Sequence, residues 1–133
     1  MSCFKAGTKF YILMTEYDID YQTPTVLKSV SGLTYIPAGV AHNMMLERGY
    51  AVYDDLHMPG DYHPNNTYAY LTALSSYRVM FNENCNNVPM KDFEFIKKEN
   101  VPGSNNTQKE QFIERMKECV EDALKVDLLK MKW

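Results

Sequence analysis

The stretch GLTYIPAGVAHNMMLERGYAVY, residues 32–53, contains the clearest secondary-structure signals of this 133-residue chain. Its first apolar run, residues 33–36, is rich in β-branched and aromatic side chains, as strands prefer. Pro37 follows at a position where a helix can begin, because the first helical residue needs no partner for its amide group. We therefore predict a strand that leads into a short helix over about residues 37–48.

The sequence around the predicted helix supports these bounds. Val40 and Met44 are four residues apart and share one helical face. Gly49 follows and can adopt the left-handed conformation that commonly ends a helix. Residues 50–53, Tyr-Ala-Val-Tyr, are then predicted as a second strand. Such a unit buries one face of its helix against a pair of strands.

Short apolar runs separated by Pro, Gly and Asn turns predict further strands along the chain. These are residues 9–21, 25–30, 77–81 and 93–96, while residues 68–76 are compatible with either helix or strand. At this length one domain is expected. We predict a single α+β domain over residues 1–133, with a mostly antiparallel sheet of about four to six strands.

A long amphipathic helix is predicted over residues 107–131, after a linker at residues 101–106. Thr107 and Glu110 have the spacing of a capping box. If the helix continued to Lys132, it would be about 39 Å long, more than a small sheet covers. Its apolar stripe therefore contacts either a partner, another copy included, or its own sheet. The candidate interaction residues are Phe112, Met116, Val120, Leu124, Leu128, Met131 and Trp133.

Composition excludes several classes of protein. Net charge is −3 without a long basic run, so a nucleic-acid footprint is not indicated. No apolar run approaches the roughly 20 residues that span a bilayer, and the N-terminus lacks the apolar core of a signal peptide. Cys3, Cys85 and Cys119 are too scattered for a disulfide framework or a zinc ribbon. We expect a protein of the cytoplasm, or of a particle assembled there, with no membrane partner.

The segment 54–63 is the best candidate for a chemical site, because it gathers three carboxylates and two histidines in ten residues. His57, Asp61 and His63 are ligand types for zinc, iron or nickel. His57 and Asp61 also suit a general-base pair, and His42 lies among methionines, a combination that suits copper. The spacing matches no metal motif, so the alternative is a polar surface loop whose histidines form local hydrogen bonds.

Nucleophilic catalysis would need Cys85, Ser75 or Ser76 beside a histidine. None of these residues lies in a recognisable turn motif, and no Gly-rich phosphate loop occurs. We expect no cofactor.

Residues 34–51 resemble a local pattern in small structural proteins of tailed-phage heads and necks. In that pattern an extended segment leads into a helix with an early Ala and a central Leu or Met, and Gly-x-Ala then precedes a strand. The matching positions are Ala41, Met45, Gly49 and Ala51, in a segment that covers less than a fifth of the chain. The resemblance implies a virion component whose partners are other protein subunits.

Three functions are therefore compared. The first is a non-enzymatic assembly protein, such as a phage virion component, that acts through contacts with other subunits or with itself. The second is a small phage-type inhibitor or ligand-binding protein. The third is a metal-dependent enzyme that uses residues 54–63.

Overall fold

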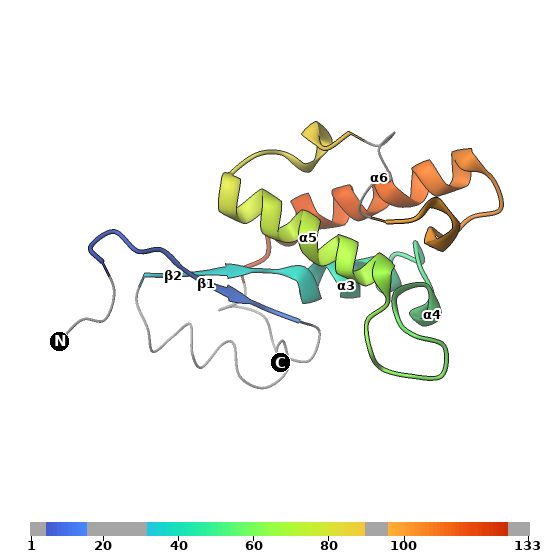
Figure 1. Cartoon of the computed structure of the whole chain (residues 1–133), viewed down its shortest axis with the longest axis horizontal. Helices are drawn as coiled ribbons and strands as arrows, with labels where there is room; N and C mark the ends of the chain where they lie inside the picture. Colours follow the sequence, from blue (N-terminus) through green and yellow to red (C-terminus); the bar gives the residue numbers. More distant parts are fainter. Residues whose placement is uncertain (1–4, 16–31, 90–95, 128–133) are drawn as a thin grey trace.

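The structure is a computed structural model, and it describes residues 5–15, 32–89 and 96–127. Figure 1 shows α5 and α6 lying across α3, with the two strands to one side of these helices. None of the described helices is long and apolar enough to cross a membrane. The elements are β1 (Phe10–Leu13), β2 (Leu33–Ile36), α3 (Ala38–Glu47), α4 (Tyr53–Leu56), α5 (Asn66–Phe81), the 3-10 turns η1 (Cys85–Asn87) and η2 (Lys98–Asn100), and α6 (Asn106–Ala123).

The described sheet consists of β1 and β2 paired in parallel, with Phe10 opposite Leu33 and Leu13 opposite Ile36. A mixed α+β fold is confirmed, but the mostly antiparallel sheet of several strands is wrong for the described residues. Parallel strands need a crossover connection and not a tight hairpin. The strand predicted at 25–30, the second half of 9–21 and most of 93–96 lie outside the described residues.

The predicted strand and helix around Pro37 are confirmed as β2 and α3. The helix begins at Ala38, one residue later than predicted, because Pro37 is the N-cap and not the first helical residue. The Gly39 amide donates to the Met14 carbonyl (2.8 Å), which fastens the end of β1 to the start of α3. Gly49 has a φ of +66°, so the predicted left-handed end of the helix is also confirmed.

The strand predicted at residues 50–53 is wrong. The Tyr50 and Ala51 amides both donate to the Met45 carbonyl, at 2.9 and 3.2 Å, so the chain folds back tightly after Gly49. The Val52 amide then donates to Asp55 Oδ2 (2.9 Å), which starts α4. The Gly-x-Ala sequence of the phage-like pattern therefore leads into a short helix instead of a strand.

The strand predicted at residues 77–81 is also wrong, because these residues are the last turn of α5. The signals for this helix were at its ends. Asn65 Oδ1 accepts hydrogen bonds from the Thr67 and Tyr68 amides (2.8 and 3.1 Å), and Asn82 ends the helix with a φ of 54°. The buried positions of α5 also follow a helical period: Thr67, Tyr68, Leu71, Leu74 and Ser75.

Helix α6 is shorter than predicted and starts one residue earlier. Asn105 is its N-cap and accepts from the Gln108 amide (2.9 Å), while Gln108 Oε1 accepts from the Ser104 amide (2.7 Å), so the capping pair is not Thr107 and Glu110. The helix ends at Ala123, and residues 124–127 are not helical. Its length is about 27 Å, which α3 and α5 can cover.

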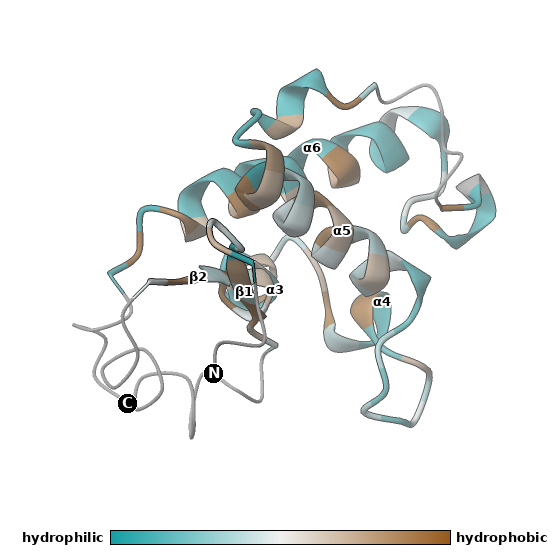
Figure 2. Ribbon diagram, turned by 60° about the vertical axis from the view of Figure 1, so that its left-hand side comes forward, coloured by the Kyte–Doolittle hydropathy of each residue, from teal (hydrophilic) through white to brown (hydrophobic). Residues whose placement is uncertain are grey.

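The core lies between α3, α5 and α6, and the hydrophobic bands along α5 and α6 in Figure 2 recur as in amphipathic helices. Phe112, Met116 and Val120 are 5%, 0% and 0% exposed and belong to this core. The prediction that these three residues contact a partner is therefore corrected: their own chain buries them. Leu124 is half-buried, and the other predicted interaction residues, Leu128, Met131 and Trp133, lie outside the described residues.

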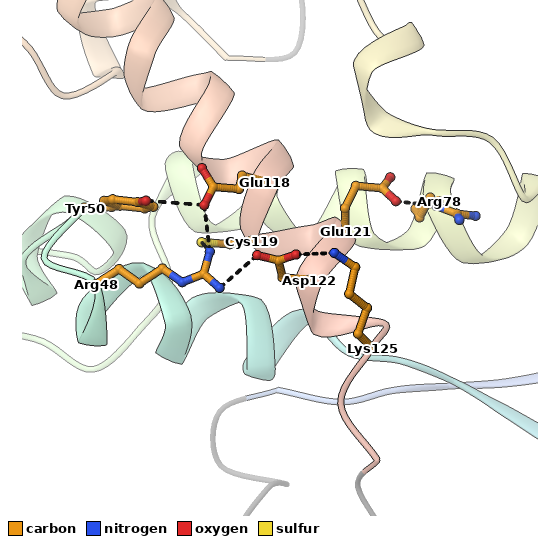
Figure 3. A network of polar contacts seen from close by, with 8 residues as sticks. All are labelled: Arg48, Tyr50, Arg78, Glu118, Cys119, Glu121, Asp122 and Lys125. Atoms are coloured by element: carbon orange, nitrogen blue, oxygen red, sulfur yellow. Dashed lines mark hydrogen bonds and ion pairs between the residues drawn. The ribbon is translucent and has the colours of Figure 1, made fainter.

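Ion pairs fasten α3 and α5 to opposite sides of α6 (Figure 3). Arg48, after α3, donates to Glu118 (2.9 Å) and Asp122 (2.8 Å). Arg78 of α5 donates from Nε to Glu121 (3.0 Å). The carboxylates of α6 thus hold the surrounding helices in register, and this charged network has a structural role.

The Asp122 carboxylate makes part of this stability depend on pH. Hydrogen bonds from Lys125 (2.6 Å) and then Arg48 lower the pKa of Asp122. A lowered pKa contributes stability above the unfolded value, near pH 4, and this contribution is lost as pH falls through the folded value. We expect Asp122→Asn to be less stable than wild type at pH 7, and the difference to shrink towards pH 3. Urea denaturation across this range tests the effect; a difference that is constant with pH would contradict it.

Candidate functional site

The predicted metal ligands do not come together. His57 is fully buried, and its Nδ1 lies 3.1 Å from the Tyr53 carbonyl oxygen. His63 and Asp61 are exposed and pair with each other, with 2.7 Å between Nδ1 and Oδ1. Within residues 5–15, 32–89 and 96–127, no group of three or more His, Cys, Asp or Glu side chains is arranged to hold a metal ion. The structure therefore gives no support to a metal-dependent enzyme at residues 54–63.

Two of the histidines instead belong to a buried aromatic cluster. The His57 ring stacks on Tyr53 at a centroid distance of 3.7 Å and meets His42 edge-on at 5.0 Å. His42 stacks on Tyr68 at 4.7 Å, and its Nδ1 lies 2.9 Å from Asn43 Oδ1. The cluster joins α3, α4 and α5, so its imidazoles are packing residues between the helices.

The candidate nucleophiles are also structural. Cys85 is buried, and its Sγ donates to the Leu74 carbonyl (3.6 Å). Burial raises the pKa of the Cys85 thiol to about 12 and that of Cys119 to about 11, so neither forms the reactive thiolate at neutral pH. Ser75 and Ser76 donate to backbone carbonyls four residues earlier in α5.

A polar hollow of about 540 Å³ lies along α6, but its charged side chains already have partners. Lys117 is buried, and its Nζ donates to the Val88 carbonyl (2.8 Å). Glu118 accepts from Arg48, and Glu121 accepts from Arg78 and from the Cys85 amide. We interpret this hollow as a by-product of the network that holds the helices.

The loop between α4 and α5 is the remaining candidate, and it projects from the body of the molecule in Figure 1. At its tip the Asp61 amide donates to the Met58 carbonyl (2.9 Å) across Pro59 and Gly60, and Gly60 has a φ of +71°. Pro and then a left-handed Gly are the residues that a type II turn requires. The Met58 amide also donates to the His63 carbonyl (2.9 Å), which pairs the two arms of the loop.

Asn65 closes the base of this loop. Besides capping α5, its Nδ2 donates to the carbonyls of Asp55 (3.0 Å) and His57 (3.1 Å), and its amide donates to the Leu56 carbonyl (3.0 Å). Both ends of the loop are therefore attached to helices, so the loop presents its side chains from a fixed frame.

Replacing Asn65 by alanine removes the cap of α5 and the two hydrogen bonds from Nδ2 together. We expect a loss of unfolding free energy of about 2–3 kcal/mol. Asn105→Ala is the matched control, because Asn105 caps α6 through one hydrogen bond alone, and about 1 kcal/mol is expected for it. Equal losses in urea denaturation would show that the Nδ2 bonds contribute nothing.

Large apolar side chains of α4 and its flanking segments are partly exposed, although Tyr53 stacks on His57 and Tyr62 on His63. Val52, Tyr53, Met58 and Tyr62 are 65%, 43%, 49% and 63% exposed, and we call these four residues the loop surface. Exposed apolar groups that cluster on a soluble domain commonly mark a contact site. The histidines and carboxylates of residues 54–63 predicted a ligand site, whereas the exposure of Met58 and Tyr62 could not be predicted from their residue types.

Tyr62 separates two hollows of the surface. The smaller, of about 370 Å³, is lined by Tyr53, Asp54, Gly60, Asp61 and Tyr62. The larger, which we call the apolar hollow, has a volume of about 560 Å³. Its lining residues are mostly apolar, and the buried Tyr68 connects it to the histidine cluster. They are Leu13, Thr15, Tyr62, His63, Pro64, Tyr68, Ala69 and Thr72.

Comparison with known proteins adds no relative. No protein-family model matches the chain, and no curated protein or solved structure is significantly similar to it. A function must therefore be argued from the site itself.

Proposed function

We propose that this chain is a non-enzymatic interaction protein that binds another protein through the loop surface. The observation that carries the proposal is the exposure of Met58 and Tyr62, at 49% and 63%, on a loop closed by hydrogen bonds at its tip and base, together with the exposure of Val52, at 65%, directly before α4. Tyr and Met are enriched at protein interfaces. A loop that is already held in place loses little conformational entropy on binding.

A selection experiment tests this proposal. A display library of random short peptides is panned against the wild-type protein and against a serine variant, in which Val52→Ser, Met58→Ser and Tyr62→Ser are combined. Because these side chains are largely exposed, the variant should keep its stability within about 0.5 kcal/mol per site. We expect clones that bind wild type and not the serine variant. Clones that bind both proteins equally would place the contact elsewhere and contradict the proposal.

The phage virion remains a narrower form of this proposal, and the resemblance at residues 34–51 is its sole support. It predicts that the chain copurifies at fixed stoichiometry with assembled particles, which mass spectrometry of such particles measures. If the chain were absent from such particles, the proposal of a virion component would be wrong, and the broader proposal of an interaction protein would stand.

Binding of a small ligand is the second candidate, and the apolar hollow favours it. Its volume of about 560 Å³ lies in the range of small-molecule sites, which are mostly apolar with a few polar groups. A thermal-shift screen with small aromatic compounds tests this function, since a ligand of the native state raises the melting temperature. A true ligand loses its effect in Ala69→Trp, which places a large side chain in the hollow; a screen without any shift would contradict this candidate.

A further inference from the structure

The loop surface and the apolar hollow have a chemistry that indicates what kind of partner they accept. This inference rests on the proposed function and adds the character of the bound segment. Its two supports are independent: the lining of the apolar hollow, and the charge of the residues that line the neighbouring hollow.

The apolar hollow can accept an apolar side chain of a partner. Leu13, Pro64 and Ala69 contribute apolar lining, and Leu13 is itself 44% exposed. Tyr68 is 2% exposed and is held by stacking on His42, so this part of the lining is fixed. An anchor side chain that enters a preformed pocket is the usual centre of binding energy at a protein interface.

Two carboxylates line the hollow that adjoins the apolar hollow at Tyr62. Between Arg48 and Arg78 the sequence has three aspartates and no lysine, arginine or glutamate. Asp54 and Asp61 line the smaller hollow on the other side of Tyr62. Asp61 pairs with His63 (2.7 Å), and this hydrogen bond lowers the pKa of Asp61, which favours the negatively charged form. Arg48, the basic residue that precedes this segment, is held by Glu118 and Asp122 of α6.

We propose that the loop surface binds a basic segment of another protein, with an apolar anchor side chain in the apolar hollow and lysine or arginine residues beside Asp54 and Asp61. A second copy of this chain is a poorer occupant. Two copies facing each other through this surface would bring their Asp54 and Asp61 carboxylates together, and like charges across an interface oppose association.

The peptides enriched on wild type test this inference. We expect them to combine an apolar residue with flanking lysine or arginine. A leading peptide should bind Ala69→Trp at least about tenfold more weakly, because the anchor has lost its hollow. It should bind the double variant Asp54→Asn/Asp61→Asn about three- to tenfold more weakly. Binding to wild type should also weaken as salt rises above about 0.15 M.

Glu110→Gln is the matched control, because Glu110 is an exposed carboxylate on α6 that lines neither hollow, and its binding should equal wild type. Enriched peptides that lack basic residues but fail on the serine variant would overturn this inference and leave the proposed function standing. Peptides that bind the serine variant as well as wild type would overturn both. Self-association that is abolished by Ala69→Trp would replace the basic partner with a second copy.

Discussion

Replacing Met116 by alanine is expected to lower the free energy of unfolding by about 2–5 kcal/mol, the range for truncating a large side chain in a packed core. Met116 has no exposed surface and lies in the core formed by α3, α5 and α6. Because this core is internal to one chain, the loss should not depend on protein concentration. Urea denaturation at two protein concentrations measures both quantities.

Gln111→Ala is the control for this prediction, since Gln111 is exposed on the same helix and should change stability by less than about 0.5 kcal/mol. A loss in Met116→Ala that grows on dilution would show that a second copy covers the helix. In that case the apolar stripe of α6 would contact a partner, and the conclusion that the same chain buries it would be wrong.

Replacing His57 by alanine is expected to cost about 2–4 kcal/mol of stability, because it leaves a cavity in the aromatic cluster. The ring of His57 is fully buried, lies 3.7 Å from the Tyr53 ring and meets His42 at 5.0 Å. His57→Phe keeps most of the ring volume and loses the polar contact to the Tyr53 carbonyl, so about 1 kcal/mol is expected. Thermal or urea unfolding of the two variants measures this difference.

His63→Ala is the comparison that separates a packing histidine from a surface one. The His63 side chain is 61% exposed, so its removal should cost less than about 0.5 kcal/mol. If His57→Ala were as stable as wild type, or if His57→Ala and His63→Ala both lost a bound metal, the packing role of His57 would be wrong.

The local elements with matching signals at both ends were predictable from sequence. Strand β2 and helix α3 follow from the β-branched run, Pro37 and Gly49, and the start and stop signals agree with the apolar period between them. The same logic failed for α5. Its cap, Asn65, lies in a run of turn-forming residues that reads as a loop, and its last turn contains aromatic residues that also suit strands.

The arrangement of the elements was less predictable. Whether β1 and β2 pair in parallel depends on the route of residues 14–32, and nothing in the four residues of either strand specifies it. The apolar stripe of α6 was recognised, but a stripe has the same sequence whether its own chain or a partner covers it. Shortening of the helix to Ala123 brings it within reach of α3 and α5.

In the candidate site too, the sequence indicated the residue types, but their positions in space could not be predicted from it. Residues 54–63 were identified as unusual because of their histidines and carboxylates. Three-dimensional placement then separated the buried His57 from the exposed pair of Asp61 and His63. The apolar side chains of this segment, Met58 and Tyr62, became significant only through their exposure.

Amide hydrogen exchange tests the central claim that a partner covers the loop surface. The exchange of each segment is compared with and without the leading peptide selected on the wild-type protein. We predict slower exchange at residues 57–64 in the complex and unchanged exchange across α6. Slower exchange on α6, with residues 57–64 unaffected, would contradict the account.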